Sequence, residues 1–122
     1  MSLNIEVEPS LPFSTTFRLE GRLDSDTTKT FDQELATALE APVQVLVMDL
    51  AKLDYISSAG ILSVMKAQKA MNARGGKTLF GYLQPGVKKV FDIVKTIDLS
   101  TVFASVKELD DYLDTIQKQI KG

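Results

Sequence analysis

Cysteine and histidine are both absent from the 122 residues of this chain. Without cysteine, the chain can form no disulfide, no thiolate nucleophile and no thiolate metal site. Without histidine, it lacks the commonest general base and the commonest metal ligand, and a Ser-His-Asp hydrolase is excluded. We therefore predict a protein that is not an enzyme and that needs no metal or other cofactor.

An excess of charge of one sign is missing too. The 14 basic and 16 acidic residues leave a net charge of −2, so no strongly basic field would draw the chain onto nucleic acid or an anionic membrane. The apolar runs are too short to cross a bilayer, and Glu6 and Glu8 interrupt the N-terminal segment where a signal peptide would be apolar. We expect a cytoplasmic protein with no nucleic-acid partner and no direct membrane insertion.

What the chain does contain is an alternation of strand-like and helix-like segments. Its composition, 44% hydrophobic and 25% charged, is typical of a globular protein, and its length suits one domain over residues 1–122. Strand patterns cover residues 3–7, 13–19, 43–50, 78–82 and 101–103. Apolar residues at helical spacing predict one helix after the segment 24–27, a second over 61–74, and two more that begin at Pro85 and at Ser105. This order predicts an α/β fold, a mixed sheet of four to five strands with a parallel core packed by about four helices.

Single residues add local expectations. Gly21 should end the second strand, and the dense apolar run 43–50 is typical of a strand covered on both faces. Asp49 and Asp54 could suggest a magnesium site, but no other residue completes one, so we interpret them as solvated loop acids. The methionines on apolar stripes should fill the core: Met48, Met65 and Met71.

The junction between the third strand and the helix that follows carries two adjacent hydroxyls, Ser57 and Ser58. The first N–H groups of a helix lack intrahelical partners and carry partial positive charge. A serine there can cap the helix, bind an anion or carry a phosphate. The residues alone leave all three uses open.

Four stretches of the chain, in order, resemble the STAS domain, the fold of bacterial anti-sigma factor antagonists. They are Gly21–Asp24, Val45–Ile61, Arg74–Lys77 and Pro85–Asp92. The resemblance covers nearly the whole length and implies a single STAS domain. Each stretch alone is a weak signal, whereas their order and spacing together are specific.

The resemblance also implies roles for residues at the junction. The family pattern there is Asp-Ser-(Ser/Thr)-Gly, which places the phosphoacceptor at Ser58 and the glycine at Gly60. Ser57 stands where the family has Asp, and Ala59 stands where it has a second hydroxyl; Ser57 is then a helix cap or a minor phosphosite. The implied partner surface comprises Asp24, Ser57, Ser58, Ala59 and Gly60, although Asp24 is equally well explained as an N-cap.

The mechanism implied by the family is a phosphorylation switch. The unphosphorylated protein, a monomer or weak dimer, binds an anti-sigma factor that is also a serine kinase, which then releases its sigma factor. Phosphorylation of an exposed Ser58 hydroxyl dissociates the complex, and a metal-dependent serine phosphatase resets it. Two alternatives remain: a non-phosphorylated regulatory subunit of a lipid-transport or stress-sensing assembly, or a nucleotide or anion sensor at Ser57 and Ser58.

Overall fold

A computed structural model describes residues 3–9, 13–96 and 105–120. Its elements are β1 (Leu3–Pro9), β2 (Ser14–Leu23), α1 (Thr28–Ala38), β3 (Val45–Ile56), α2 (Ser58–Ala73), β4 (Lys77–Gly81), α3 (Pro85–Thr96) and α5 (Val106–Ile120). The strands form one sheet in the order β1-β2-β3-β4. β1 is antiparallel to β2, and β2, β3 and β4 are parallel. The predicted mixed α/β fold is confirmed; the strand expected at 101–103 lies outside the described residues.

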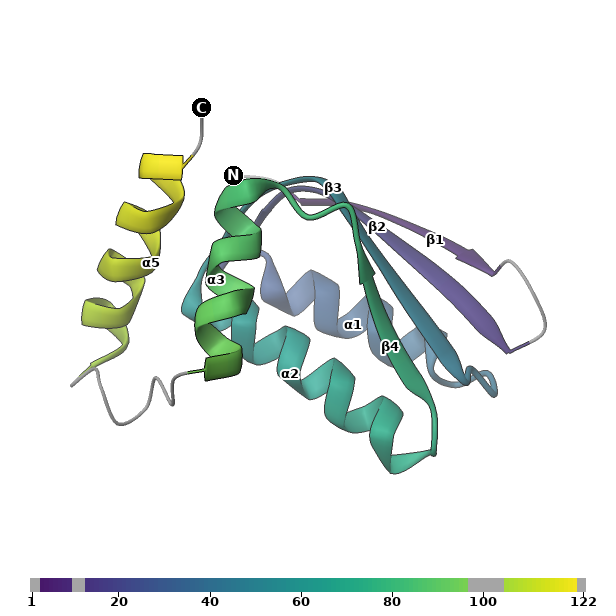
Figure 1. Cartoon of the computed structure of the whole chain (residues 1–122). Helices are drawn as coiled ribbons and strands as arrows, with labels where there is room; N and C mark the ends of the chain where they lie inside the picture. Colours follow the sequence, from purple (N-terminus) through teal and green to yellow (C-terminus); the bar gives the residue numbers. More distant parts are fainter. Residues whose placement is uncertain (1–2, 10–12, 97–104, 121–122) are drawn as a thin grey trace.

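The helices lie in two groups (Figure 1). α1 and α2 run side by side along the sheet, and α2 contacts both β3 and β4. α3 packs against β3, and α5 packs mainly on α3, with further contacts to α2 and β3. The helix at the end of the described chain therefore reaches the region where β3 passes into α2.

The buried core lies mainly on one face of the sheet. In β3 the alternate residues Leu46, Met48 and Leu50 have no exposed surface, whereas Val45 and Val47, which point to the opposite face, are half-buried. The prediction that this strand is covered on both faces was therefore wrong. The strand owes its density of apolar residues to one buried face and one partly covered face, a pattern common in sheets with helices on one side.

The core stripe of α2 is narrower than the sequence suggested. Val64, Ala67 and Met71 are buried on it, which confirms the prediction for Met71, but Met65 is 47% exposed. The prediction of Met65 as a core residue was wrong because it lies one position round the helix from Val64, beyond the edge of the contact with the sheet.

Two strands run further than their sequence signals indicated. β2 continues through Gly21, which adopts φ 111°, and a register shift between Gly21 and Arg22 marks a bulge. β3 continues to Ile56, so Asp49 and Asp54 lie within a strand and not in a loop. Asp49 is partly buried near Arg18, with Arg18 Nε 3.7 Å from Asp49 Oδ2. Both extensions carry the strands to the junction before α2.

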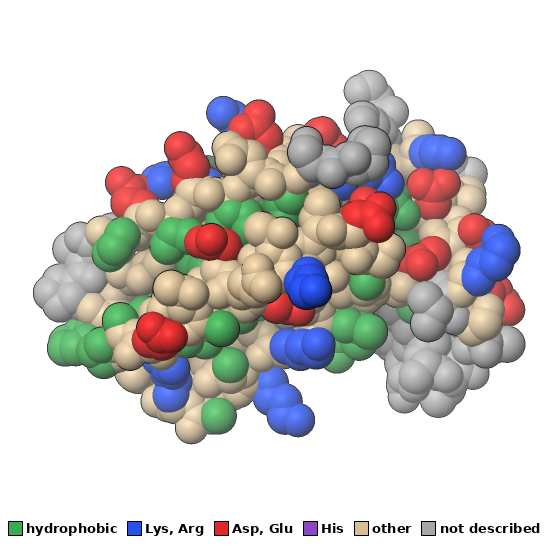
Figure 2. Space-filling model, turned by 180° about the vertical axis from the view of Figure 1, so that it is seen from behind, with side chains coloured by type: hydrophobic (Ala, Val, Ile, Leu, Met, Phe, Trp, Pro, Cys, Tyr) green, Lys and Arg blue, Asp and Glu red, His purple; other side chains and the backbone are tan. Residues whose placement is uncertain are grey.

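Within the described ranges, no helix is long and apolar enough to span a membrane. Acidic and basic side chains are interspersed over the face shown in Figure 2, so charge of one sign does not gather there.

Candidate functional site

The site is built where β2 and β3 end together. The two strands are parallel, and Arg22 pairs with Tyr55 and Leu23 with Ile56 in their register. The Ser57 N–H donates a hydrogen bond of 3.0 Å to the Leu23 carbonyl oxygen, so the pairing extends to the first residue after β3. The carboxyl ends of adjacent parallel strands meet at one edge of a sheet, which is where open α/β sheets place their sites.

Ser57 is the N-cap of α2. Its backbone is extended (φ −95°, ψ 178°), and its hydroxyl oxygen accepts a hydrogen bond of 3.2 Å from the Gly60 N–H. Its carbonyl oxygen accepts the first intrahelical bond, from the Ile61 N–H at 2.8 Å. Ser57 therefore satisfies an N–H group that would otherwise have no partner inside the helix.

Gly60 allows α2 to approach the strand ends. A Cβ atom added here would lie 2.5 Å from the Leu23 carbonyl oxygen and 2.8 Å from Ile56 Cγ1. Any larger residue must push the first turn of α2 away from β2 and β3. The glycine therefore sets the position of the preceding residues, Ser57 and Ser58, on the sheet edge.

Ser58, the first residue of α2, is buried, with 4% of its surface exposed. Its hydroxyl donates to Asp110 Oδ1 at 2.6 Å, and its backbone N–H donates to the same oxygen at 2.9 Å. The expectation of an exposed hydroxyl at this position was wrong, because α5 supplies a carboxylate that closes over it. Asp110 thus places a negative charge at the N-terminus of α2, where the helix dipole favours it.

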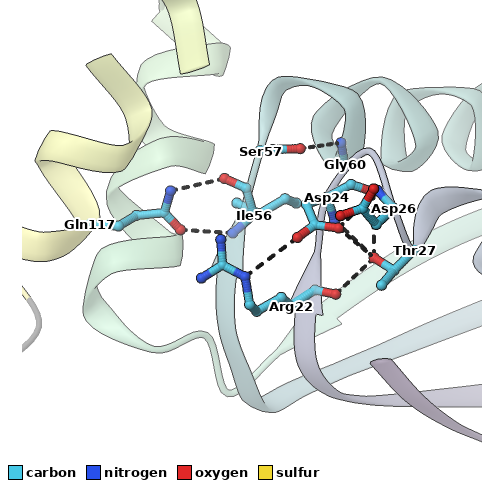
Figure 3. Close-up of polar contacts among 8 residues, drawn as sticks. All are labelled: Arg22, Asp24, Asp26, Thr27, Ile56, Ser57, Gly60 and Gln117. Carbon is cyan, nitrogen blue, oxygen red and sulfur yellow. Dashed lines mark hydrogen bonds and ion pairs between the residues drawn. The ribbon is translucent and has the colours of Figure 1, made fainter. Parts of the chain in front are cut away.

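Gln117 makes the second polar contact from α5 (Figure 3). Its Oε1 accepts a 2.8 Å hydrogen bond from the Ile56 N–H, and its Nε2 donates to the Ile56 carbonyl oxygen at 2.9 Å. Nε2 also donates to the Leu113 carbonyl oxygen at 3.0 Å, and the residue is only 3% exposed. Gln117 stands seven positions after Asp110, about two helical turns, so both residues project from the same face of α5.

Asp24 holds the turn between β2 and α1 and is not the N-cap. Thr27 is the N-cap of α1 and makes no side-chain cap bond. The Asp24 carboxylate accepts from the Asp26 N–H at 3.0 Å, and Arg22 Nε lies 3.4 Å from Asp24 Oδ2 (Figure 3). The simple N-cap reading of Asp24 is therefore wrong: its side chain stabilises the turn and faces a cation.

Arg22 links this turn to β3. Its guanidinium carbon lies 3.9 Å from the centre of the Tyr55 ring, a cation–π distance. Burial is the main cause that raises the pKa of Tyr55 above its ordinary value of 10.0; Asp114 and Asp110 raise it further, Arg22 lowers it, and Asp24 raises it slightly. Acids on α5 and in the β2–α1 turn therefore oppose ionisation of this phenol.

We expect the raised pKa of Tyr55 to weaken the fold in alkali. The folded state favours the neutral phenol of Tyr55. Its contribution to the free energy of unfolding is therefore fully present below the unfolded pKa of about 10, and it is lost as pH rises through the higher pKa of the folded state. Urea unfolding at pH 8 and above pH 10 should show a smaller alkaline loss of stability for Tyr55→Phe than for the wild type. Tyr82→Phe, at a side chain 78% exposed, is the control; equal losses in all three proteins would contradict the assignment.

Comparison with known proteins decides the family. A model of the STAS domain matches residues 2–109. The chain belongs to the STAS domain family. A curated relative, BtrV of Bordetella bronchiseptica, carries the provisional name anti-sigma factor antagonist. It is 35% identical over 75 residues, which cover 62% of this chain and 65% of BtrV, so the alignment spans just under two thirds of that relative.

Solved structures share the STAS fold. Unphosphorylated SpoIIAA, an anti-sigma factor antagonist, is 22% identical with a TM-score of 0.64, covering 74% of this chain and 83% of SpoIIAA. The phosphorylated form of SpoIIAA, described as a Bacillus cell fate determinant, gives the same identity and TM-score, covering 75% of this chain and 83% of SpoIIAA. An anti-sigma factor antagonist from Mycobacterium paratuberculosis is 16% identical with a TM-score of 0.66 over 99% and 96% of the two chains.

The structure brings the predicted STAS site residues to one sheet edge with unequal exposure. Ser57, Ser58 and Gly60 are buried, whereas Asp24 and Ala59 are half-buried. Sequence reasoning missed the residues that close the site from α5. Gln117 carried a signal, since it is a polar residue beside the apolar stripe of Leu113 and Ile116. Asp110, one acid among several on a helix, carried none.

Proposed function

We propose that this STAS domain is an anti-sigma factor antagonist, a binding protein and not an enzyme, that is switched by phosphorylation of Ser58. The observation that carries the proposal is the place of Ser58: the first residue of α2, after a capping Ser57, in a chain of this family. BtrV and SpoIIAA, both described as anti-sigma factor antagonists, support the role. Because sigma factors act on transcription, such a role belongs in the cytoplasm.

The partner in this proposal is an anti-sigma factor that is also a serine kinase. It binds the unphosphorylated domain through the sheet edge that holds Asp24, Ser57, Ser58, Ala59 and Gly60. Phosphate on Ser58 adds about −1.5 to −2 charges. A partner surface matched to a neutral hydroxyl then faces a hydrated dianion that is costly to desolvate, and the complex separates. A metal-dependent serine phosphatase returns the domain to its binding form.

The helix N-terminus gives a physical reason for the STAS core to survive phosphorylation. The first N–H groups of α2 favour negative charge, and Ser57 caps the helix independently of Ser58. SpoIIAA has been solved in both unphosphorylated and phosphorylated forms, which resemble this chain equally, with a TM-score of 0.64. We do not propose the nucleotide or anion sensor, since a free anion, unlike a phosphate bonded to Ser58, would have to displace Asp110 from the Ser58 N–H with no covalent bond to hold it there.

Two variants at Ser58 test the proposal. We expect Ser58→Asp to weaken binding to the anti-sigma factor by about tenfold or more, equivalent to about 1.4 kcal/mol, while Ser58→Ala keeps it. The measurement is titration calorimetry with the anti-sigma factor from the same organism that has a kinase-like ATPase domain. Equal affinities for the two variants would rule the switch out.

Phosphopeptide mapping separates the two serines. The domain is incubated with the same kinase and Mg-ATP, and the modified peptide is sequenced by mass spectrometry. We expect phosphate on Ser58 in the wild type and in Ser57→Ala, and none in Ser58→Ala. Phosphate retained in Ser58→Ala would move the acceptor to Ser57 or elsewhere.

A further inference from the structure

Helix α5 covers the hydroxyl that the proposed switch modifies. Ser58 Oγ is hydrogen-bonded to Asp110 at 2.6 Å, and two turns along the same helix Gln117 holds both backbone groups of Ile56. Leu113, between them, has no exposed surface. A kinase acting from solvent therefore meets α5 before it meets Ser58.

The residues that make this cover lie beyond the part of the chain that the STAS model matches. That match ends at residue 109, whereas Asp110 and Gln117 follow it. The Mycobacterium paratuberculosis structure, which covers 99% of this chain, shows that the fold extends past that point. At 16% identity it assigns no role to either side chain. The contacts of Asp110 and Gln117 are thus properties of this chain that family membership does not supply.

We propose that α5 is a cover over Ser58 that must move aside for phosphorylation and that the phosphate then holds open. This inference rests on the proposed switch and adds its regulation. Closed α5 keeps the acceptor out of reach, so a kinase modifies only the open form. The rate of modification is then set by how often the contacts of Asp110 and Gln117 break.

The chemistry of the modification explains why the cover cannot close again unchanged. In the open form, Ser58 Oγ attacks the γ-phosphorus of ATP; the Oγ–P bond forms, the bond to the ADP leaving group breaks, and the hydroxyl proton passes to solvent. The product has no proton left between Ser58 Oγ and Asp110 Oδ1. Two oxygens that shared a hydrogen bond at 2.6 Å now face each other without a donor, an arrangement that a buried site does not tolerate.

Charge acts in the same direction. The phosphate dianion would stand against the Asp110 carboxylate, and like charges at such a distance repel strongly when water is excluded. The basic residues described on α5 do not offset this, since Lys107 pairs with Asp111 and Lys118 with Asp114. The phosphate also competes with Asp110 for the Ser58 N–H at the start of α2.

Amide hydrogen exchange on a protein with phosphoserine genetically encoded at position 58 tests the cover without any kinase. We expect exchange across α5 to accelerate about ten- to hundredfold, the range for losing a hydrogen bond to a charged group, while β3 and α2 stay protected. Phosphoserine at position 25, an exposed residue, is the matched control and should leave α5 unchanged. Unchanged α5 exchange with phosphoserine 58 would overturn the proposal.

Asp110 variants separate repulsion from general loss of stability. In the phosphoserine 58 protein, Asp110→Asn should restore much of the α5 protection, because the amide can donate to the phosphate and carries no charge. In the unmodified protein, Asp110→Ala should accelerate α5 exchange, since Ser58 loses its acceptor. If Asp110→Asn fails to slow α5 exchange in the phosphorylated protein, repulsion by Asp110 is not the cause and the proposal falls.

Binding measurements keep the two proposals distinguishable. If phosphorylation lowers partner affinity while α5 stays protected from exchange, the switch is supported and the proposal that α5 covers Ser58 is contradicted. If phosphorylation releases α5 while partner affinity is unchanged, the covering of Ser58 by α5 is supported and the switch is contradicted.

Discussion

Gly60→Ala should lower the free energy of unfolding by about 3 kcal/mol, at the upper end for overpacking a closely packed site. The added Cβ would lie 2.5 Å from the Leu23 carbonyl oxygen, a backbone atom that cannot rotate away, and 2.8 Å from Ile56 Cγ1. Relief requires the first turn of α2 to move off the sheet. Urea unfolding followed by circular dichroism measures the loss.

Gly81→Ala is the matched control for this variant. Gly81 is the last residue of β4, and an added Cβ there would meet no atom within 4 Å. We expect its stability to stay close to that of the wild type. A Gly60→Ala protein as stable as Gly81→Ala would show that the junction relaxes freely and that Gly60 does not fix the position of Ser58.

Gln117→Ala should also cost about 3 kcal/mol, because it leaves a buried N–H and a buried carbonyl of Ile56 without partners and opens a cavity. Gln33→Ala, at an exposed position of α1, is the control and should change the free energy of unfolding by less than about 0.5 kcal/mol. The measurement is again urea unfolding. The dependence of the unfolding free energy on urea concentration is compared between the variants and the wild type to verify two-state behaviour.

Gln117→Leu separates hydrogen bonding from packing. It keeps most of the side-chain volume but neither polar contact, so we expect it to be nearly as destabilising as Gln117→Ala. Wild-type stability in Gln117→Leu would mean that the hydrogen bonds to Ile56 contribute little, and that apolar packing and the Asp110 contacts with Ser58 hold α5 in place. The close approach of α3 to α5 at Gly86 would then be the next packing contact to test, since an added Cβ there would lie 3.3 Å from Gln117 Cα.

The order of elements was predictable because each signal is local. A strand such as β3 shows its apolar residues within a few positions, and a helix shows its stripe within a few turns. The Ser57 cap was equally local, since its hydroxyl reaches only three residues along the chain, to Gly60. Boundaries were harder: β3 runs to Ile56, because pairing with β2 continues past the apolar run that the sequence displays.

Burial was predictable only where periodicity settles it. Met71 and Met65 both lie near the apolar stripe of α2, yet one is fully buried and the other 47% exposed. The sequence gives the direction of a helix face but not its width, because the width depends on how closely the neighbouring strands and helices approach.

The sequence by itself determined the α/β order, the family and the serine pair at the start of α2, since these depend on local patterns and on motif spacing. Tertiary structure alone decided that Ser58 is covered. Asp110 lies 52 positions from Ser58, and Gln117 lies 61 positions from Ile56. No local periodicity relates residues so far apart; the packing of α5 on α3 brings the carboxylate to the hydroxyl.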